Sequence, residues 1–330
     1  MNKVIKEIRT IRVAAVQVES RPGQIAANHA HVMPFIETAV SQGAQLVILP
    51  ELFACGYIPN PTVWRYGESL AGQTVQWLRA TAQRLGIYLG AGFAEVDGGD
   101  FYNSFALATP AGKLAGCARK TVSEAYSFRY GRGRHLITTG IGQIGIGICA
   151  DNHFTAFPRL MQRSGIDLLL MPHASPLPYK TAKLITAADI DRARENLLSI
   201  PTLYARLLGV PVLFANALGD LQPMSGLFGK LMDPALFRLL GLSRIVDGDG
   251  TLRGELGHEE GVLVAEVSLG AGFRQEQAPP DYGGWLHPGS ALVRRALRPV
   301  DLALARVYYA FSRQRRRQAR RLMAHESIKV

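Results

Sequence analysis

The sequence predicts an α/β protein, because short apolar runs of strand length alternate along the chain with amphipathic segments of helix length. The runs over residues 45–49 and 141–148 are short and rich in branched apolar residues, which is typical of buried strands. The segment Gln24–Ala44 is expected to be a helix with one apolar side, formed by Val32, Phe35, Ile36 and Val40.

Further helices are expected over residues 74–85, 154–163 and 182–208, with an interruption of the last one near Pro201. A hairpin turn is expected at Asp247-Gly248. Periodicity alone does not distinguish a doubly wound sheet from a stack of two sheets.

Length and charge divide the chain into two parts. The 330 residues are enough for one large α/β domain and an extension. Of the net charge of +11, a balance of +9 lies between Arg294 and Val330, where ten arginines and one lysine face two acidic residues. We therefore expect a domain over residues 1–290 and a basic, partly helical extension over residues 291–330.

Three of the expected strands end in an ionisable residue. Glu51 follows the run 45–50, Lys120 follows the run 113–119, and Cys149 follows the run 141–148. A buried cysteine on its own is more often a small apolar residue than a nucleophile. A carboxylate, an ammonium and a thiol together are the parts of thiol-based acyl transfer: Glu51 as general base, Lys120 as partner of an oxyanion and Cys149 as nucleophile.

The sequences around these residues resemble those of the nitrilase or carbon–nitrogen hydrolase superfamily, over roughly Ile11 to Val267. The resemblance rests on the order Glu, Lys, Cys and on these segments: Arg12–Val18, Glu51–Tyr57, Tyr102–Gly112, Gly147–Phe154, Gly165–Pro172 and Gly209–Asn216. It implies a four-layer α-β-β-α sandwich of the nitrilase type and homo-oligomerisation. It also implies a hydrolase that uses no cofactor.

The resemblance implies supporting roles for Glu124, for the backbone N–H of Ala150 and for Tyr57, which would hold the substrate or the oxyanion. For Glu124 the alternative is a solvated loop carboxylate. Asp151 and Arg159 are expected to build the turn and the helix after Cys149. Cys55 and Cys117 are interpreted as structural, and His153 and His173 receive no role.

Composition excludes other classes of protein. No uncharged apolar run approaches the ~20 residues that span a bilayer, and no secretory signal pattern opens the chain. The three cysteines fit no zinc motif, so no metal is expected. A thiol nucleophile needs a reducing environment, and we expect a cytoplasmic protein.

Two segments leave alternatives open. Residues 223–242 are apolar and are interpreted as a short packed helix, as a lid over an apolar pocket, or as a membrane contact. The tail has an apolar stripe that would dock on the domain or across a dimer, formed by Val300, Leu304, Val307, Tyr308 and Phe311. Beyond it, Arg313–Arg321 is either a solvated helix end or an arm for nucleic acid or acidic lipid.

We therefore expect a thiol-dependent hydrolase of non-peptide C–N bonds that acts on a small amide or N-carbamoyl substrate through a Cys149 thioester. Two alternatives stay open: a nitrilase that acts on a C≡N group, and a non-catalytic binding or scaffold protein with a basic tail. The expected partners are the small-molecule substrate, further copies of the chain, and a weak anionic partner for the arginine-rich tail.

Overall fold

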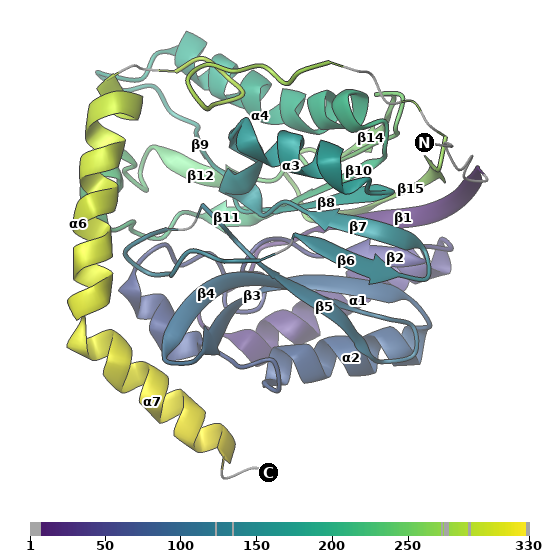
Figure 1. Cartoon of the computed structure of the whole chain (residues 1–330), viewed down its shortest axis with the longest axis horizontal. Helices are drawn as coiled ribbons and strands as arrows, with labels where there is room; N and C mark the ends of the chain where they lie inside the picture. The colour runs from purple at the N-terminus through teal and green to yellow at the C-terminus, as the bar shows by residue number, and fades with distance from the viewer. Residues whose placement is uncertain are drawn as a thin grey trace.

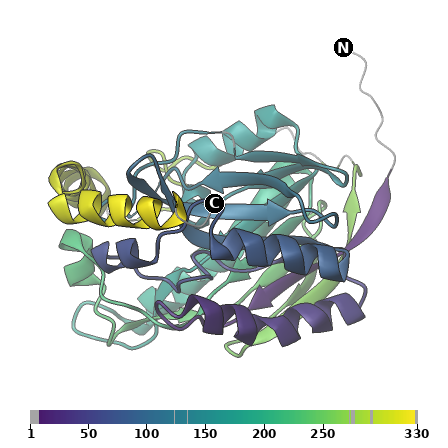
Figure 2. The same cartoon turned by 90° about the horizontal axis from the view of Figure 1, so that it is seen from below.

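Two six-stranded sheets lie face to face, with helices on both outer sides (Figure 1). The computed structural model describes residues 8–327 except 123, 134, 272, 274–276, 290 and 291. The helices α1 (Ile25–Ser41) and α2 (Gln73–Leu85) cover one side, and α3 (Ala156–Ser164) and α4 (Ala187–Leu208) cover the other (Figures 1 and 2). The expected four-layer α-β-β-α sandwich is confirmed.

The first sheet has the strand order β15-β1-β2-β3-β4-β5, in which β1, β2 and β3 run parallel and the other neighbours are antiparallel. Its strands are β1 (Arg9–Gln17), β2 (Leu46–Ile48), β3 (Tyr88–Asp97), β4 (Asp100–Ala108), β5 (Leu114–Arg119) and β15 (Gly261–Leu269). The carboxyl ends of β2 and β5 carry two of the predicted site residues.

The second sheet has the order β14-β13-β10-β8-β7-β6, with β7, β8 and β10 parallel. Its strands are β6 (Leu136–Thr139), β7 (Gly142–Ile146), β8 (Leu168–His173), β10 (Val212–Asn216), β13 (Arg244–Val246) and β14 (Leu252–Glu255). The antiparallel pair β13 and β14 forms the hairpin expected at Asp247-Gly248. A small third sheet joins β11 (Leu218–Asp220), β12 (Phe237–Leu240) and β9 (Pro176–Pro178).

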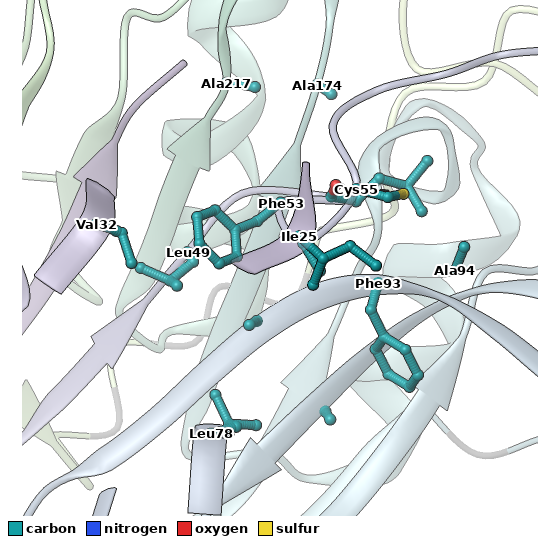
Figure 3. Packing of buried hydrophobic residues seen from close by; sticks show 14 of the residues in the cluster. Ile25, Val32, Leu49, Phe53, Cys55, Leu78, Phe93, Ala94, Ala174 and Ala217 are labelled. Atoms are coloured by element: carbon teal, nitrogen blue, oxygen red, sulfur yellow. Dashed lines mark hydrogen bonds between the residues drawn. The ribbon is translucent and has the colours of Figure 1, made fainter. Parts of the chain in front are cut away.

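Three apolar cores separate the four layers. The core between the sheets takes side chains from both of them, among them Val13, Leu46, Phe105, Ile144, Leu170 and Leu213. A second core joins α1 and α2 to the first sheet, and Figure 3 shows part of it, including Val32 of α1 and Leu78 of α2. A third joins α3 and α4 to the second sheet. The inter-sheet core fixes how the strand ends of the two sheets face one another.

The expected interruption of the long helix near Pro201 is wrong, because α4 is continuous there. It begins at Ala187, where Thr186 and Asp189 form a capping box, and it continues without a break through Pro201 to Leu208. A proline inside a helix removes one backbone hydrogen bond. Here Leu197 and Tyr204, one turn before and after Pro201, are buried in the core and hold both halves of the helix against the sheet.

The extension packs along the edge of the sandwich as α6 (Arg298–Phe311) and α7 (Arg313–Ser327), after a short π-helix over Val293–Leu297 (Figure 1). The expected domain boundary, between residues 290 and 291, lies outside the described residues. No helix in the described part of the chain is both long and apolar enough to cross a membrane.

Within the described part of the chain, the predicted stripe of α6 docks on the domain only through Tyr308, whose ring centre lies 6.4 Å from that of Trp64 and 5.7 Å from that of Tyr126. Its residues are 42–74% exposed, whereas Asp301, Ala305 and Tyr309 on the opposite side are buried. The backbone N–H of Phe101 donates to the Tyr309 hydroxyl at 2.8 Å. Most of the larger apolar side chains of α6 therefore face solvent, while the buried Tyr309 secures the inner side through a polar contact.

One of the two interpretations of residues 313–321, a solvated helix end, is wrong for part of the helix. Ala319 is completely buried, and Arg315 is only 8% exposed. The Arg315 guanidinium donates to the Asp100 carboxylate at 2.5 Å and to the Gly99 carbonyl at 2.6 Å. The helix α7 is therefore attached to the hairpin between β3 and β4.

The substitution Tyr309→Phe is expected to lower the free energy of unfolding by about 1–3 kcal/mol, because it leaves the buried N–H of Phe101 without its acceptor. Tyr308→Phe is the matched control, since the Tyr308 side chain is 42% exposed and its hydroxyl forms no hydrogen bond within the described residues. Urea denaturation of both variants measures the difference. Equal stabilities would show that the Tyr309 contact does not hold α6.

Candidate active site

The three residues predicted from strand ends come together between the two sheets. Glu51 follows β2 and Lys120 follows β5, both in the first sheet, and Cys149 begins a 3₁₀ turn over Cys149–His153 that follows β7 in the second. All three are at most 7% exposed. The face-to-face stacking of the sheets thus brings a carboxylate and an ammonium from one sheet to a thiol from the other.

Lys120 is the centre of this group. Its side chain is fully buried, and its Nζ lies 2.6 Å from Oε1 of Glu51 and 2.7 Å from Oε1 of Glu124. The Glu124 side chain is only 13% exposed. The structure therefore places Glu124 in the site as a partner of Lys120, and the alternative of a solvated loop carboxylate is wrong.

Neutral donors fix both carboxylates. Nδ2 of Asn103, on β4, donates to Oε1 of Glu51 at 2.7 Å, and the backbone N–H of Ala174 donates to Oε2 of Glu51 at 2.9 Å. The Tyr57 hydroxyl donates to Oε1 of Glu124 at 3.1 Å. Each carboxylate is thus held by Lys120 and by at least one further donor, which leaves little rotational freedom.

Glu51 and Glu124 differ in pKa, although both interact with the Lys120 ammonium. Burial raises the pKa of Glu51, and the Lys120 ammonium opposes this only in part. Burial also acts on Glu124, but there the charge and hydrogen bond of Lys120 prevail and lower its pKa. Of the two, Glu51 is suited to gain and lose a proton during a reaction, and Glu124 is suited to stay ionised.

Burial and the neighbouring charges also determine the protonation states of Lys120 and Cys149. Burial on its own would lower the pKa of Lys120, but the carboxylates of Glu124 and Glu51 raise it well above its usual value. Burial and the Glu51 carboxylate raise the pKa of Cys149, while Lys120 opposes them. The resting site therefore holds a protonated lysine and a neutral thiol, so the thiol needs a base when it reacts.

The turn at Cys149 has a strained geometry. Cys149 has a φ of 45°, in the left-handed region that residues with a side chain rarely adopt. Gly147, two residues earlier, has no room for a Cβ, which would lie 2.0 Å from Oδ1 of Asn152. Ala150 is at a position where a helix start leaves an N–H group without an intrahelical acceptor.

Asp151 builds this turn, as expected. Its carboxylate is buried and accepts the backbone N–H groups of Thr121, Val122 and Ile148 at 3.0, 2.8 and 3.3 Å. One side chain therefore ties the loop that follows Lys120 to the turn that carries Cys149. Arg159, on α3, forms an exposed ion pair with Asp281 at 3.1 Å and lies outside this arrangement.

A cavity of about 450 Å³ opens above the thiol. Cys149, Ala150, Glu124 and Tyr57 line it, whereas Glu51 and Lys120 lie behind them. The remainder of the wall is mainly apolar and includes Leu177, Leu197, Met224, Met232, Trp285 and Leu302. Its size and apolar lining are those of a small-molecule site.

Two segments that the sequence left open contribute to this wall. Met224 and Met232 flank α5 (Gly226–Leu231), the short helix of the apolar segment 223–242, which contacts α6. Leu302 comes from α6 itself. The segment thus contains a short packed helix, as one interpretation expected, together with the strand β12, which was not expected, and it also covers part of the cavity.

Sequence reasoning missed several residues of the site. Asn103 and Ala174 hold Glu51, and Ser175 places its Oγ 3.7 Å from the Cys149 sulfur. His173 lies between Ser175 and Asn152, with its ring nitrogens 2.9 and 2.8 Å from their polar atoms. One sequence feature could have indicated these residues. Residues 173–175 come at the carboxyl end of the apolar strand β8, which is the same edge of the second sheet that carries Cys149.

The two cysteines interpreted as structural, Cys55 and Cys117, lie outside the site. Cys55 is buried in the core beneath the first sheet, and Cys117 lies within β5. His153 lines the cavity, and burial lowers its pKa to about 4, so it is neutral at pH 7. Within the described residues, no group of three or more His, Cys, Asp or Glu side chains is arranged to hold a metal ion.

Comparison with known proteins agrees with this architecture. A carbon–nitrogen hydrolase from Helicobacter pylori superposes with a TM-score of 0.68 at 22% sequence identity, over 78% of this chain and 89% of that one. The two stacked sheets are thus the fold of a known class of hydrolases. The sequence model of the carbon–nitrogen hydrolase family matches residues 12–272, and the chain belongs to this family.

Curated relatives include different activities. A protein named nitrilase from Pyrococcus abyssi is 32% identical over 176 residues, which cover 51% of this chain and 67% of that protein. The omega-amidase NIT2 of Danio rerio is 30% identical over 176 residues, which cover 49% of this chain and 63% of that protein. The matched regions thus span about two thirds of these relatives.

Proposed function

We propose that this protein hydrolyses amides of apolar carboxylic acids, with Cys149 as nucleophile, Glu51 as general base and acid, and Lys120 as the partner of the oxyanion. The observation that carries this proposal is the buried contact of Lys120 with Glu51 beside the Cys149 thiol, at the base of an apolar cavity. Membership of the carbon–nitrogen hydrolase family and an omega-amidase among the relatives support it.

The first half-reaction forms a thioester. The Cys149 sulfur attacks the carbonyl carbon while its proton passes to Glu51, whose raised pKa favours accepting it. The carbonyl oxygen becomes an oxyanion, stabilised by the Lys120 ammonium and the backbone N–H of Ala150. Glu51 then gives its proton to the nitrogen, the C–N bond breaks, and ammonia or an amine leaves.

The second half-reaction releases the acid. Glu51 takes a proton from a water molecule, whose oxygen attacks the thioester carbon, and the C–S bond breaks as the proton returns to the Cys149 sulfur. Glu124 is ionised throughout and keeps Lys120 in place. The same groups serve both steps, so no cofactor is required.

The cavity favours an apolar acyl group. Its volume of about 450 Å³ is far larger than a short amide such as propionamide needs, and its wall is mainly apolar. A long alkyl or aryl-alkyl chain would remove this surface from water, with a gain of about 25 cal/mol per Å² buried. We therefore propose 4-phenylbutyramide or hexanamide as better substrates than propionamide.

The substitution Cys149→Ala is expected to reduce ammonia release from 4-phenylbutyramide by at least about 10³-fold, because no thioester forms without the sulfur. Cys117→Ala is the matched control, since this second cysteine lies within β5, away from the cavity. Ammonia is measured over a panel of amides, N-carbamoyl compounds and nitriles. Turnover that survives Cys149→Ala would overturn the assignment of the nucleophile, and turnover of nitriles alone would show a nitrilase.

The substitution Leu302→Trp is expected to lower kcat/KM for 4-phenylbutyramide roughly tenfold or more, since the indole fills the apolar part of the cavity. The rate with propionamide is expected to stay unchanged, because the reacting groups are untouched. Leu304→Trp, on the exposed side of the same helix at 51% exposure, is the control. A uniform loss with both amides, or an equal effect of the two variants, would contradict the proposed acyl site.

A further inference from the structure

The outer side of α6 carries a continuous apolar surface. Its outer stripe consists of Val300, Leu304, Val307, Tyr308 and Phe311, which are 53%, 51%, 59%, 42% and 74% exposed. Single exposed apolar residues are ordinary on a soluble protein, but five on one side of one helix form a patch. Tyr308, at the border of this patch, packs against the rings of Trp64 and Tyr126, whereas Val300, Leu304, Val307 and Phe311 are 51–74% exposed.

The domain holds this surface in a fixed position. The Asp301 carboxylate accepts the Tyr126 hydroxyl at 3.1 Å and the backbone N–H of Leu227 at 2.8 Å. The Arg298 guanidinium lies over the rings of Phe154 and Trp285, at 4.5 and 5.0 Å from their centres. The outer stripe is therefore presented by a docked helix, so binding would require little ordering of the chain.

The next helix adds a positive charge. On α7 five arginines are exposed, and none of them forms an ion pair with a described residue: Arg313, Arg316, Arg317, Arg320 and Arg321. Arg315, in contrast, is buried against Asp100. We call the five exposed side chains the arginine cluster of α7.

We propose that the outer stripe of α6 and the arginine cluster of α7 bind the surface of an anionic phospholipid bilayer. An apolar stripe with adjacent arginines is the composition of a helix that lies in a membrane interface, where the apolar side chains enter the acyl boundary and the cations meet the headgroups. The protein would thus bind at the surface without crossing the membrane.

The charges favour this occupant over two others. A second copy that covered the outer stripe with its own outer stripe would offer the arginine cluster no carboxylate, because none of the stripe residues is acidic. A nucleic acid would satisfy the arginines, but its phosphate backbone offers nothing to an apolar stripe. Only a bilayer with anionic headgroups matches both features.

The test is sedimentation of the full-length protein with two kinds of vesicle, one of phosphatidylcholine alone and one of equal parts phosphatidylcholine and phosphatidylglycerol. We expect binding to the anionic vesicles to be at least about tenfold tighter and to weaken as salt is added. The double substitution Arg316→Gln and Arg320→Gln is expected to reduce this preference. No binding to anionic vesicles, or equal binding to both kinds, would overturn the proposal.

Two neighbouring positions give a matched pair of variants for the apolar contribution. Phe311→Asp removes a side chain of the outer stripe and is expected to weaken vesicle binding about tenfold, whereas Ala310→Asp adds the same charge beside the stripe and is expected to have a smaller effect. Thermal unfolding checks that both variants stay folded. An equal effect of the two would contradict a role for the stripe.

Two further results would identify a different occupant. If light scattering shows a dimer that Phe311→Asp converts to a monomer, without vesicle binding, a second copy covers the stripe. If the wild-type chain binds an oligonucleotide and ignores anionic vesicles, the arginine cluster serves nucleic acid. Either outcome would overturn the membrane proposal.

Discussion

The buried Lys120 ammonium is the group on which the site depends. An ammonium without partners in such a place would lose its proton or destabilise the fold, and only close carboxylates offset the loss of water. Glu51 and Glu124 provide them at 2.6 and 2.7 Å. These two contacts keep Lys120 charged and Glu124 ionised, whereas burial raises the pKa of Glu51 against the opposing effect of Lys120. The acid–base properties of the site therefore follow from burial together with the position of one cation.

The stacking of two sheets converts this cluster into a reactive site. The ion pairs belong to the first sheet and Cys149 to the second, and the apolar core between the sheets sets their approach. Asp151 adds a direct link between the loop after Lys120 and the Cys149 turn. Burial raises the pKa of the Cys149 thiol, and in the proposed mechanism this neutral thiol reacts only when a substrate and Glu51 are both in place.

The sequence was sufficient to predict that Glu51, Lys120 and Cys149 lie in one site, because each follows an apolar strand within a local motif, whereas their catalytic roles stay predictions. Asn103 and Ala174 escaped prediction, since their contacts with Glu51 join segments distant in the sequence. The orientation of α6 was also out of reach. Both of its sides carry apolar residues, and the side that docks is the one whose residues Asp301 and Tyr309 form polar contacts with the domain.

The pH dependence of kcat/KM for amide hydrolysis tests the central claim most directly. In the proposed mechanism Glu51 acts first as a base, so activity is expected to be lost as the pH falls and its carboxylate becomes protonated. Because burial raises the pKa of Glu51, we predict an acid limb with an apparent pKa above the ordinary glutamate value of about 4.3. Glu124, with a lowered pKa, adds no limb there. An acid limb at or below the ordinary value would contradict the assignment of Glu51 as the base.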